Sequence, residues 1–575
     1  MRFNSSTLQR LLLSCPNVKN STHATSSRRW FLVLLLLLIL AFNFAIRWRL
    51  RDMPLERDEG EYAYAGQLIL QGILPYKIAF NMKFPGTYFM YALLMAIFGQ
   101  SAAAIHIGIL LVTSLTALLV FFIGRELLSD AGALIATAIY VCLATLPKAA
   151  GLAGHATHFV SLFACAGIAA LLMARKSRPI LWWFLSGTAF GLAILMKQHA
   201  VFFPLFILVW FLWNRFRKKS SPNTGIIVLL FCVGCVIPFL LTAIGFACAG
   251  LWKPFVFWTF QYASQYVSML PLGAAPGQFA AGFDPVFESA IWPWLFGIVG
   301  LLCIWKKAAW KGPVELAALM FLAGMAAACP GFYFRNHYFL MAMPGLALLN
   351  AAFILTLAKA FKNHFNPSRP SSSSDKRHSA FRIPHSAFIM LCLTTFIIGD
   401  LVLNNAGTWF NTAPLQLSRQ LYGNNPFPEA VPVAKYLEDH TATADTIAVL
   451  GSEPEFFFLA HRHSASGYIY LYSLTEPQPL APQMQKEFMS QVETNRPKFV
   501  VSVNNPVSWY SLVMPISFQY ASAIQDWWAN YSTNYNLIGA VKIPADKPSQ
   551  FSWNESSLNP ADITNDDLLI YRHKP

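Results

Sequence analysis

Residues 30–48 read WFLVLLLLLILAFNFAIRW, and the acidic stretch ERDEGE follows at 56–61. The first stretch has the length and apolar character of a helix that crosses the hydrocarbon core of a bilayer. The 575-residue chain is 55% hydrophobic and 12% charged, with a mean hydropathy of +0.45. A soluble domain carries about 25% charged residues. The sequence therefore predicts a polytopic α-helical membrane protein.

Eleven apolar segments have the character of membrane spans. They lie near residues 30–48, 103–124, 131–148, 156–174, 180–197, 199–214, 225–249, 288–305, 314–330, 338–358 and 386–404. The stretch from Phe84 to Phe98 is also apolar, but it is short for a span. We expect it to form an interfacial or re-entrant helix on the outer side of the membrane.

Basic residues mark alternate loops between these spans. They fall in the loops at 125–126, 175–178, 215–219, 306–311 and 359–382. A cytoplasmic N-terminus places all five loops on the cytoplasmic side, as the positive-inside bias requires. The odd number of spans then places the C-terminal region outside. We predict a multi-pass protein of the plasma (inner) membrane with an extracytoplasmic C-terminal domain.

The formal net charge of +15 is unevenly distributed along the chain. Residues 407–575 contain 10 Lys and Arg against 15 Asp and Glu, whereas the remainder contains 32 against 12. The basic surplus lies chiefly in short loops of the membrane part, where it is a topology signal. We therefore expect membrane lipids as partners and no nucleic acid.

The region after the last span has the pattern of a small α/β domain. Strand-like runs at 446–450 and 498–503 are separated by helical stretches at 429–440 and 480–494. The predicted organisation is a cytoplasmic tail (1–29), a transmembrane core (30–360) with a first outer loop (49–102), a cytoplasmic linker (361–385), a last span (386–404) and an extracytoplasmic α/β domain (405–575).

Polar residues from several outer loops are expected to meet at one depth, at the outer edge of the membrane. Ionisable groups are costly there, so their convergence predicts a functional site. The candidate residues are Asp58, Glu59, Tyr62, Lys83, His155, His158, Lys197, Gln198, Glu288, Arg335, His337 and Tyr338.

The types of these residues indicate a chemistry. A carboxylate such as Asp58 can act as a general base, and Lys83, Lys197 and Arg335 can hold a phosphate. No nucleotide sugar is available outside the cell, so a membrane carrier is the expected source of an activated sugar. The pattern favours transfer from a lipid-phosphate donor.

Three segments of the chain resemble a known class of enzymes. RDEGEYAYA at 57–65, GILPY at 72–76 and KFPGTY at 83–88 resemble the first-loop signature of GT-C membrane glycosyltransferases. The nearest groups are the superfamily of protein O-mannosyltransferases and lipid A aminoarabinose transferases, and its bacterial relatives with a C-terminal outer domain. MKQ at 196–198 and FRNHYFL at 334–340 resemble further segments of those relatives.

The resemblance implies roles for individual residues. Asp58 matches the carboxylate that activates the acceptor, Glu59 matches its neighbour that shapes the pocket, and Lys83 matches the lysine that contacts the polyprenyl phosphate. His337 and Tyr338 are then expected on the donor side with Lys197 and Arg335. Tyr62, His155, His158, Gln198 and Glu288 are candidates for the acceptor or the pocket wall. The resemblance also implies inversion at the sugar carbon by direct displacement.

The sequence departs from the aminoarabinose transferases at one place. They typically have Lys-Pro-Pro where this chain has Lys83-Phe84-Pro85-Gly86. The sugar, a hexose or a pentose, is therefore not assigned, and the acceptor is a lipid, a glycan or a protein. No cofactor is expected. A divalent metal is compatible with the pattern but not required, because the pair His155 and His158 would need further ligands.

Two other interpretations fit parts of the pattern. A transporter or flippase of a lipid-linked sugar would need polar groups along a path through the bilayer, whereas these residues cluster on one side. A non-catalytic scaffold would serve only to present the C-terminal domain. Each residue also has a structural interpretation: Lys83 and Lys197 as snorkelling lysines, Arg335 as an anchor at the head groups, and Glu288 as part of a helix cap.

Overall fold

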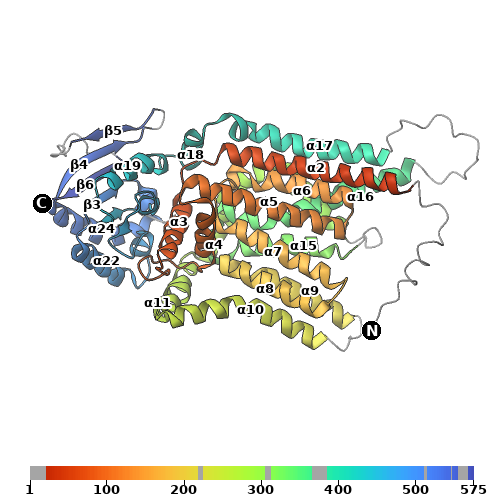
Figure 1. Ribbon diagram of the computed structural model, residues 1–575, viewed down its shortest axis with the longest axis horizontal. Helices are drawn as coiled ribbons and strands as arrows, with labels where there is room; N and C mark the ends of the chain where they lie inside the picture. Colours follow the sequence, from red (N-terminus) through yellow and green to blue (C-terminus); the bar gives the residue numbers. More distant parts are fainter. Residues whose placement is uncertain are drawn as a thin grey trace, which may run out of the picture.

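A computed structural model describes residues 21–217, 224–304, 312–365, 385–509, 514–544, 547–554 and 567–575. A bundle of long helices forms one part, and a domain built on a β-sheet lies at one end of it (Figure 1). The predicted polytopic helical fold with a small C-terminal α/β domain is confirmed. Most of the predicted cytoplasmic tail and linker lies outside the described residues.

Each of the eleven expected spans corresponds to a helix. These helices are α2 (Ser21–Arg49), α5 (Ala102–Leu127), α6 (Asp130–Ala144), α7 (Ala156–Ala174), α8 (Pro179–Met196), α9 (Phe202–Arg217), α10 (Thr224–Cys248), α14 (Ile291–Cys303), α15 (Glu315–Ala327), α16 (Met343–Phe365) and α17 (His385–Ala406). Within the described ranges, eight helices are long and apolar enough to cross a membrane. Helices α6, α14 and α15 are shorter than a span.

Local sequence explains these three short helices. α6 ends at Ala144, and the chain then enters the 3-10 turn η1 (Pro147–Ala149). α15 ends just before Pro330 and Gly331, where φ is +75°. α14 meets α13 (Ala275–Glu288) at a bend of 102° across a short break. All three pack against the buried α16, which lies at the centre of the bundle.

The end of the bundle that faces the sheet carries several short elements. α3 (Arg57–Leu70) and α4 (Gly86–Phe98) cross the ends of the long helices (Figure 1). Their position agrees with the interfacial helix expected at 84–98. On the same side lie η2 (Gln198–Val201), α11 (Trp252–Val256), η3 (Phe257–Tyr262), α12 (Ala263–Val267), η4 (Leu272–Ala274), η6 (Pro330–Phe332) and η7 (Asn336–Ala342).

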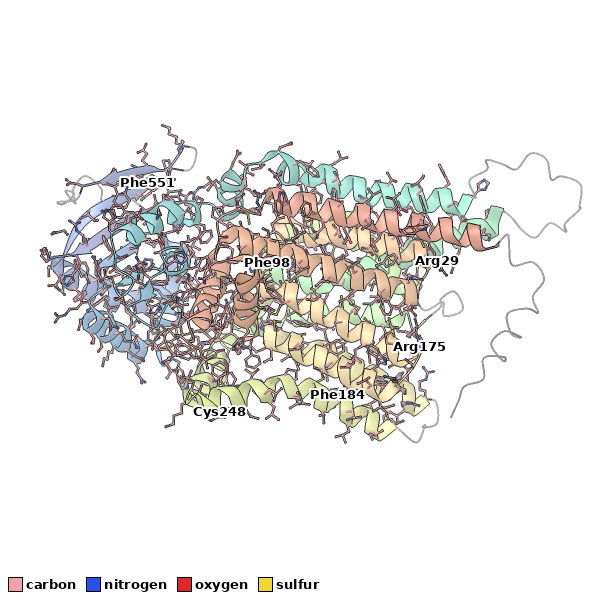
Figure 2. The ribbon with its side chains drawn as sticks, in the orientation of Figure 1. Arg29, Phe98, Arg175, Phe184, Cys248 and Phe551 are labelled. Carbon is pink, nitrogen blue, oxygen red and sulfur yellow. The ribbon has the colours of Figure 1, made fainter. Side chains whose placement is uncertain are left out.

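Labelled residues mark the two ends of the bundle. Arg29 and Arg175 lie at the end away from the sheet, whereas Phe98 and Cys248 lie at the end next to it (Figure 2). The basic loop at 175–178 and the C-terminal domain therefore lie at opposite ends of the bundle, which agrees with the predicted topology.

The C-terminal domain has a six-stranded mixed sheet in the order β2-β1-β3-β6-β4-β5. The central strands β1 (Thr446–Leu450) and β3 (Phe499–Val503) are parallel, as the predicted alternation of strands and helices requires. β6 is antiparallel to both β3 and β4, and β5 is antiparallel to β4. The other strands are β2 (His463–Ser464), β4 (Tyr535–Lys542), β5 (Gln550–Trp553) and β6 (Leu568–His573).

Helices connect and cover these strands. Two of them, α19 and α22, occupy the stretches predicted to be helical. The helices and turns of this region are η8 (Gly407–Asn411), α18 (Pro414–Tyr422), α19 (Phe427–Asp439), α20 (Glu455–Leu459), α21 (Tyr472–Thr475), α22 (Ala481–Asn495), α23 (Pro506–Trp509), α24 (Met514–Tyr531) and η9 (Ser532–Asn534).

Candidate active site

A cavity of about 800 Å³ lies between the end of the bundle and the C-terminal domain. Three parts of the chain line it: the first loop with α3, the ends of the bundle helices, and the C-terminal domain. Eight of the twelve predicted site residues are in its wall, namely Asp58, Lys83, His155, Lys197, Gln198, Arg335, His337 and Tyr338. The C-terminal domain adds Tyr470, Tyr472, Ser473 and Glu476, which the sequence did not single out.

The start of α3 places Asp58 in this wall. Glu56 and Glu59 form a capping box: the Glu59 backbone N–H donates to Glu56 Oε1 (2.9 Å), and the Glu56 N–H donates to Glu59 Oε2 (3.2 Å). This arrangement satisfies two backbone donors that a helix start otherwise leaves unpaired. It fixes the first turn, to which Asp58 belongs.

The two oxygens of Asp58 have different surroundings. Oδ1 accepts from Lys83 Nζ at 2.8 Å, and the Tyr470 hydroxyl lies 3.4 Å away. Oδ2 is 3.7 Å from His155 Nδ1 and accepts no hydrogen bond from the described part of the chain. Burial opposes ionisation of Asp58, but the Lys83 ammonium, with His155 and His337, outweighs it and holds the pKa of Asp58 well below its usual range.

Lys83 is held between two carboxylates. Its Nζ donates to Asp58 and, at 2.5 Å, to Glu61 Oε2, and it lies 4.6 Å from the centre of the Tyr62 ring. The Tyr88 hydroxyl donates to the other Glu61 oxygen. Burial lowers the pKa of Lys83, but the two carboxylates outweigh this and raise it well above its usual range. Lys83 is therefore an ammonium ion whose charge is largely balanced.

Lys197 and Arg335 differ from Lys83 in this respect. Neither forms an ion pair with any residue that the structure describes. Lys197 Nζ lies 4.0 Å from the centre of the Tyr338 ring, and the Arg335 guanidinium lies 5.7 Å from that of Tyr333. Both side chains line the cavity and give it two cations that can receive an anionic ligand.

Gln198 and two of the histidines in the wall, His155 and His337, have structural contacts. Gln198 Nε2 donates to the carbonyl oxygen of Met82 at 2.9 Å and so holds the loop that carries Lys83. The rings of His155 and His337 are stacked, with centres 3.9 Å apart and planes 6° from parallel.

Four predicted residues do not line the cavity. Glu59 is fully buried and accepts from His106 Nε2 at 3.0 Å and from the Gly154 N–H. His158 is buried and contacts the carbonyl oxygen of Gly151 through Nε2 at 3.0 Å. Tyr62 is buried beneath Lys83, and Glu288 is exposed at the end of α13.

One group of side chains has donor atoms suited to a metal ion. A carboxylate oxygen of Asp58 and one ring nitrogen each of His155 and His337 lie within 4.8 Å of one another. This group differs from the pair His155 and His158 considered from the sequence. An imidazole binds a metal in the plane of its ring, and two parallel stacked rings cannot both direct a lone pair at one ion unless one of them turns. The arrangement as it stands fits a metal poorly.

The fold and the site together define a class of protein: a polytopic helical bundle with a charged cavity between the bundle and an α/β domain. A family model described as dolichyl-phosphate-mannose-protein mannosyltransferase matches residues 83–241. The undecaprenyl phosphate-alpha-4-amino-4-deoxy-L-arabinose arabinosyl transferase of Pseudomonas aeruginosa (strain UCBPP-PA14) is 28% identical over 286 residues, covering 47% of this chain and 50% of that protein. Undecaprenyl phosphate-alpha-4-amino-4-deoxy-L-arabinose arabinosyl transferase 2 of Pseudomonas fluorescens (strain Pf0-1) is 27% identical over 300 residues, covering 50% of this chain and 52% of that protein. The chain spans about half the length of the curated relatives it matches.

Solved structures share the fold. ArnT from Cupriavidus metallidurans, bound to undecaprenyl phosphate, aligns with a TM-score of 0.53 and 14% identity, over 82% of this chain and 93% of that one. The archaeal oligosaccharyltransferase AglB from Archaeoglobus fulgidus, in complex with an inhibitory peptide and a dolichol-phosphate, aligns with a TM-score of 0.52 and 10% identity, over 92% and 75%. These similarities confirm the resemblance to GT-C membrane glycosyltransferases that the sequence shows.

Proposed function

We propose that this protein transfers a sugar from a polyprenyl-phosphate-linked donor to an envelope acceptor, with inversion, at the outer face of the plasma membrane. One observation carries the proposal. Asp58 lines the cavity, and its Oδ2 accepts no hydrogen bond from the described residues. Lys197 and Arg335 line the same cavity and have no ion-pair partner among those residues. A carboxylate base and two available cations suit a reaction in which a hydroxyl loses its proton and a phosphate departs.

The proposed reaction is a single displacement. The acceptor hydroxyl oxygen attacks the anomeric carbon of the sugar on the face opposite the phosphate. The bond from that carbon to the phosphate oxygen breaks as the new bond forms, so the configuration inverts. The hydroxyl proton passes to Asp58 Oδ2, and the electron pair of the broken bond stays on the polyprenyl phosphate. Lys197 and Arg335 offset the charge on the leaving phosphate.

Lys83 links the two halves of this reaction. Its ammonium holds the pKa of Asp58 low in the structure described here. When a donor phosphate enters the cavity, Lys83 is shared between the phosphate and Asp58. Asp58 then loses part of the positive charge that favours its ionised form and becomes a stronger base. Donor binding thereby makes Asp58 more basic before the reaction begins.

The rest of the cavity suits a lipid donor. Val201, Phe202, Phe260 and Val267 give one part of the wall an apolar character that fits a prenyl chain. The cavity lies between the bundle and the C-terminal domain, which is at the end of the bundle away from Arg29 and Arg175 (Figure 2). The positive-inside bias supports an outward-facing site.

The experiment that tests this proposal separates turnover from donor binding. The purified protein is supplied with polyprenyl-phosphate sugars and an envelope fraction extracted from the host, and the affinity for undecaprenyl phosphate is measured separately. We expect Asp58→Asn to lower transfer about 100-fold or more, because the base is lost, while the Kd for undecaprenyl phosphate stays within about threefold. We expect Lys197→Met to weaken that binding about tenfold, because a charge-assisted contact is lost.

Lys253→Met is the matched control, because Lys253 is an exposed lysine on α11 that does not line the cavity. It is expected to leave both quantities unchanged. Near-normal transfer by the Asp58→Asn protein would refute the proposed base.

A further inference from the structure

The side chain of Arg57, next to Asp58, makes its hydrogen bonds to the C-terminal domain. Its Nε donates to the carbonyl oxygen of Ser452 at 2.6 Å. Its Nη2 donates to Glu453 Oε1 at 2.7 Å and to Asn425 Oδ1 at 2.9 Å. The first turn of α3 is therefore attached through Arg57 to a domain that lies almost 400 residues further along the chain.

Glu453 is itself fixed on both sides. Its side chain is fully buried, and its second oxygen accepts from the Ser508 hydroxyl at 2.5 Å. The Ser508 hydroxyl in turn accepts from the Ser452 backbone N–H at 2.9 Å. A buried ion pair adds little net stability, because desolvation offsets the attraction, but it specifies a geometry. The Glu453 carboxylate thus holds the Arg57 guanidinium in one orientation.

Two further contacts attach the same turn to the domain. The Tyr470 hydroxyl donates to the backbone oxygen of Arg57 at 2.8 Å. Gly60 lies directly against Glu455, and a Cβ atom at position 60 would be only 2.7 Å from the Glu455 Cβ atom and backbone nitrogen. The orientation of the Asp58 side chain therefore depends on how the C-terminal domain sits on α3.

We propose that Glu453 is a positioning residue for Asp58, acting through Arg57, so that the C-terminal domain completes the active site. Glu453 does not line the cavity, and it has no contact with substrate to lose. Misplacement of a reacting group by about 1 Å can cost about 100-fold in rate. Lys197 and Arg335 lie on other elements, so their contacts with a donor phosphate do not pass through this link. The inference rests on the proposed function, because it assigns the purpose of the link to the base.

The test compares turnover with donor affinity in Glu453→Gln, which keeps the shape of the side chain and removes its charge. We expect the apparent kcat, measured with the extracted donor and acceptor fractions, to fall about 10–100-fold. We expect the Kd for undecaprenyl phosphate to stay within about twofold. Glu487→Gln is the control, because Glu487 is an exposed glutamate on α22 of the same domain, and it should leave both unchanged.

A double-mutant cycle shows whether Glu453 acts through Arg57. If it does, adding Glu453→Gln to Arg57→Gln costs no more than about a further twofold in kcat, because the link is already broken. Losses that multiply in the double variant would overturn the inference, as would normal kcat in Glu453→Gln.

If Glu453→Gln does not fold, Ser508→Ala is the second test. It removes the hydroxyl that donates to the second Glu453 oxygen and accepts from the Ser452 N–H, and it leaves the Glu453 carboxylate and Arg57 in place. We expect a severalfold lower kcat with unchanged Kd, and an unchanged kcat would overturn the inference. Failure of the proposed function gives a different result: the wild-type protein then transfers no sugar at all.

Discussion

At the scale of residues, the central pair of the site could be predicted, but its surroundings could not. The resemblance in the first loop indicated Asp58 and Lys83, and their side chains are 2.8 Å apart. It also suggested Glu59 as a neighbour in the pocket, but Glu59 is buried behind the wall. The second carboxylate on Lys83 is Glu61. Its signal was its spacing, because residues three apart share one face of a helix.

Glu455 provides a prediction about stability at this scale. It is fully buried, and neither carboxyl oxygen has a hydrogen-bond partner among the described residues. Burial, and next the charge of Glu453, raise the pKa of Glu455 well above its usual range. The folded state then binds more protons than the unfolded state, so the free energy of unfolding falls as pH rises above the unfolded value of about 4.3.

We therefore expect Glu455→Gln to unfold at a higher temperature than the wild-type protein at pH 7.5. Its free energy of unfolding should be larger by on the order of 1 kcal/mol. The advantage should shrink as the pH falls toward 4.5, because the wild-type carboxyl group then binds its proton in the folded state. Thermal unfolding in detergent across this range measures the effect. A difference that is independent of pH would contradict the assignment.

At the scale of elements, the long apolar helices could be predicted, whereas three of the expected spans are shorter helices than the sequence suggested. Composition identified α6, α14 and α15 as spans, but hydropathy does not register the turn at Pro147, the kink at Gly331 or the bend after α13. Of the eleven expected spans, eight meet the criteria of length and composition within the described ranges. The remaining three all pack against α16.

The contact of α3 with α20 gives a prediction at this scale. Gly60→Ala places a Cβ atom against the Glu455 backbone, and such overpacking typically costs about 1–3 kcal/mol. We expect a lower unfolding temperature and a lower rate of transfer, because α3 must move away from α20. Gly245→Ala is the control, because Gly245 lies in α10 with no other atom within 4 Å of the added Cβ position. Equal behaviour of the two variants would show that the contact between α3 and α20 is unimportant.

At the scale of the whole molecule, the charge pattern predicts a cytoplasmic end and an outer end of the bundle, and this orientation stays a prediction. The basic residues Arg29 and Arg175 and the C-terminal domain lie at opposite ends (Figure 2). The role of that domain could not be predicted, because its contacts with α3 join residues about 400 positions apart. Hydrophobic periodicity and local motifs carry no information about such pairs. The structure instead shows a cavity with walls from both parts of the protein.

The central claim is that sugar transfer and release of polyprenyl phosphate are one event at this cavity. The most direct measurement uses the wild-type protein in sealed vesicles that contain polyprenyl-phosphate sugars extracted from the host, with the acceptor fraction on the side of the C-terminal domain. The account predicts one polyprenyl phosphate released for each sugar gained by the acceptor, and neither product with Asp58→Asn. Movement of the intact donor lipid across the bilayer, without release of its phosphate, would contradict it and indicate a transporter.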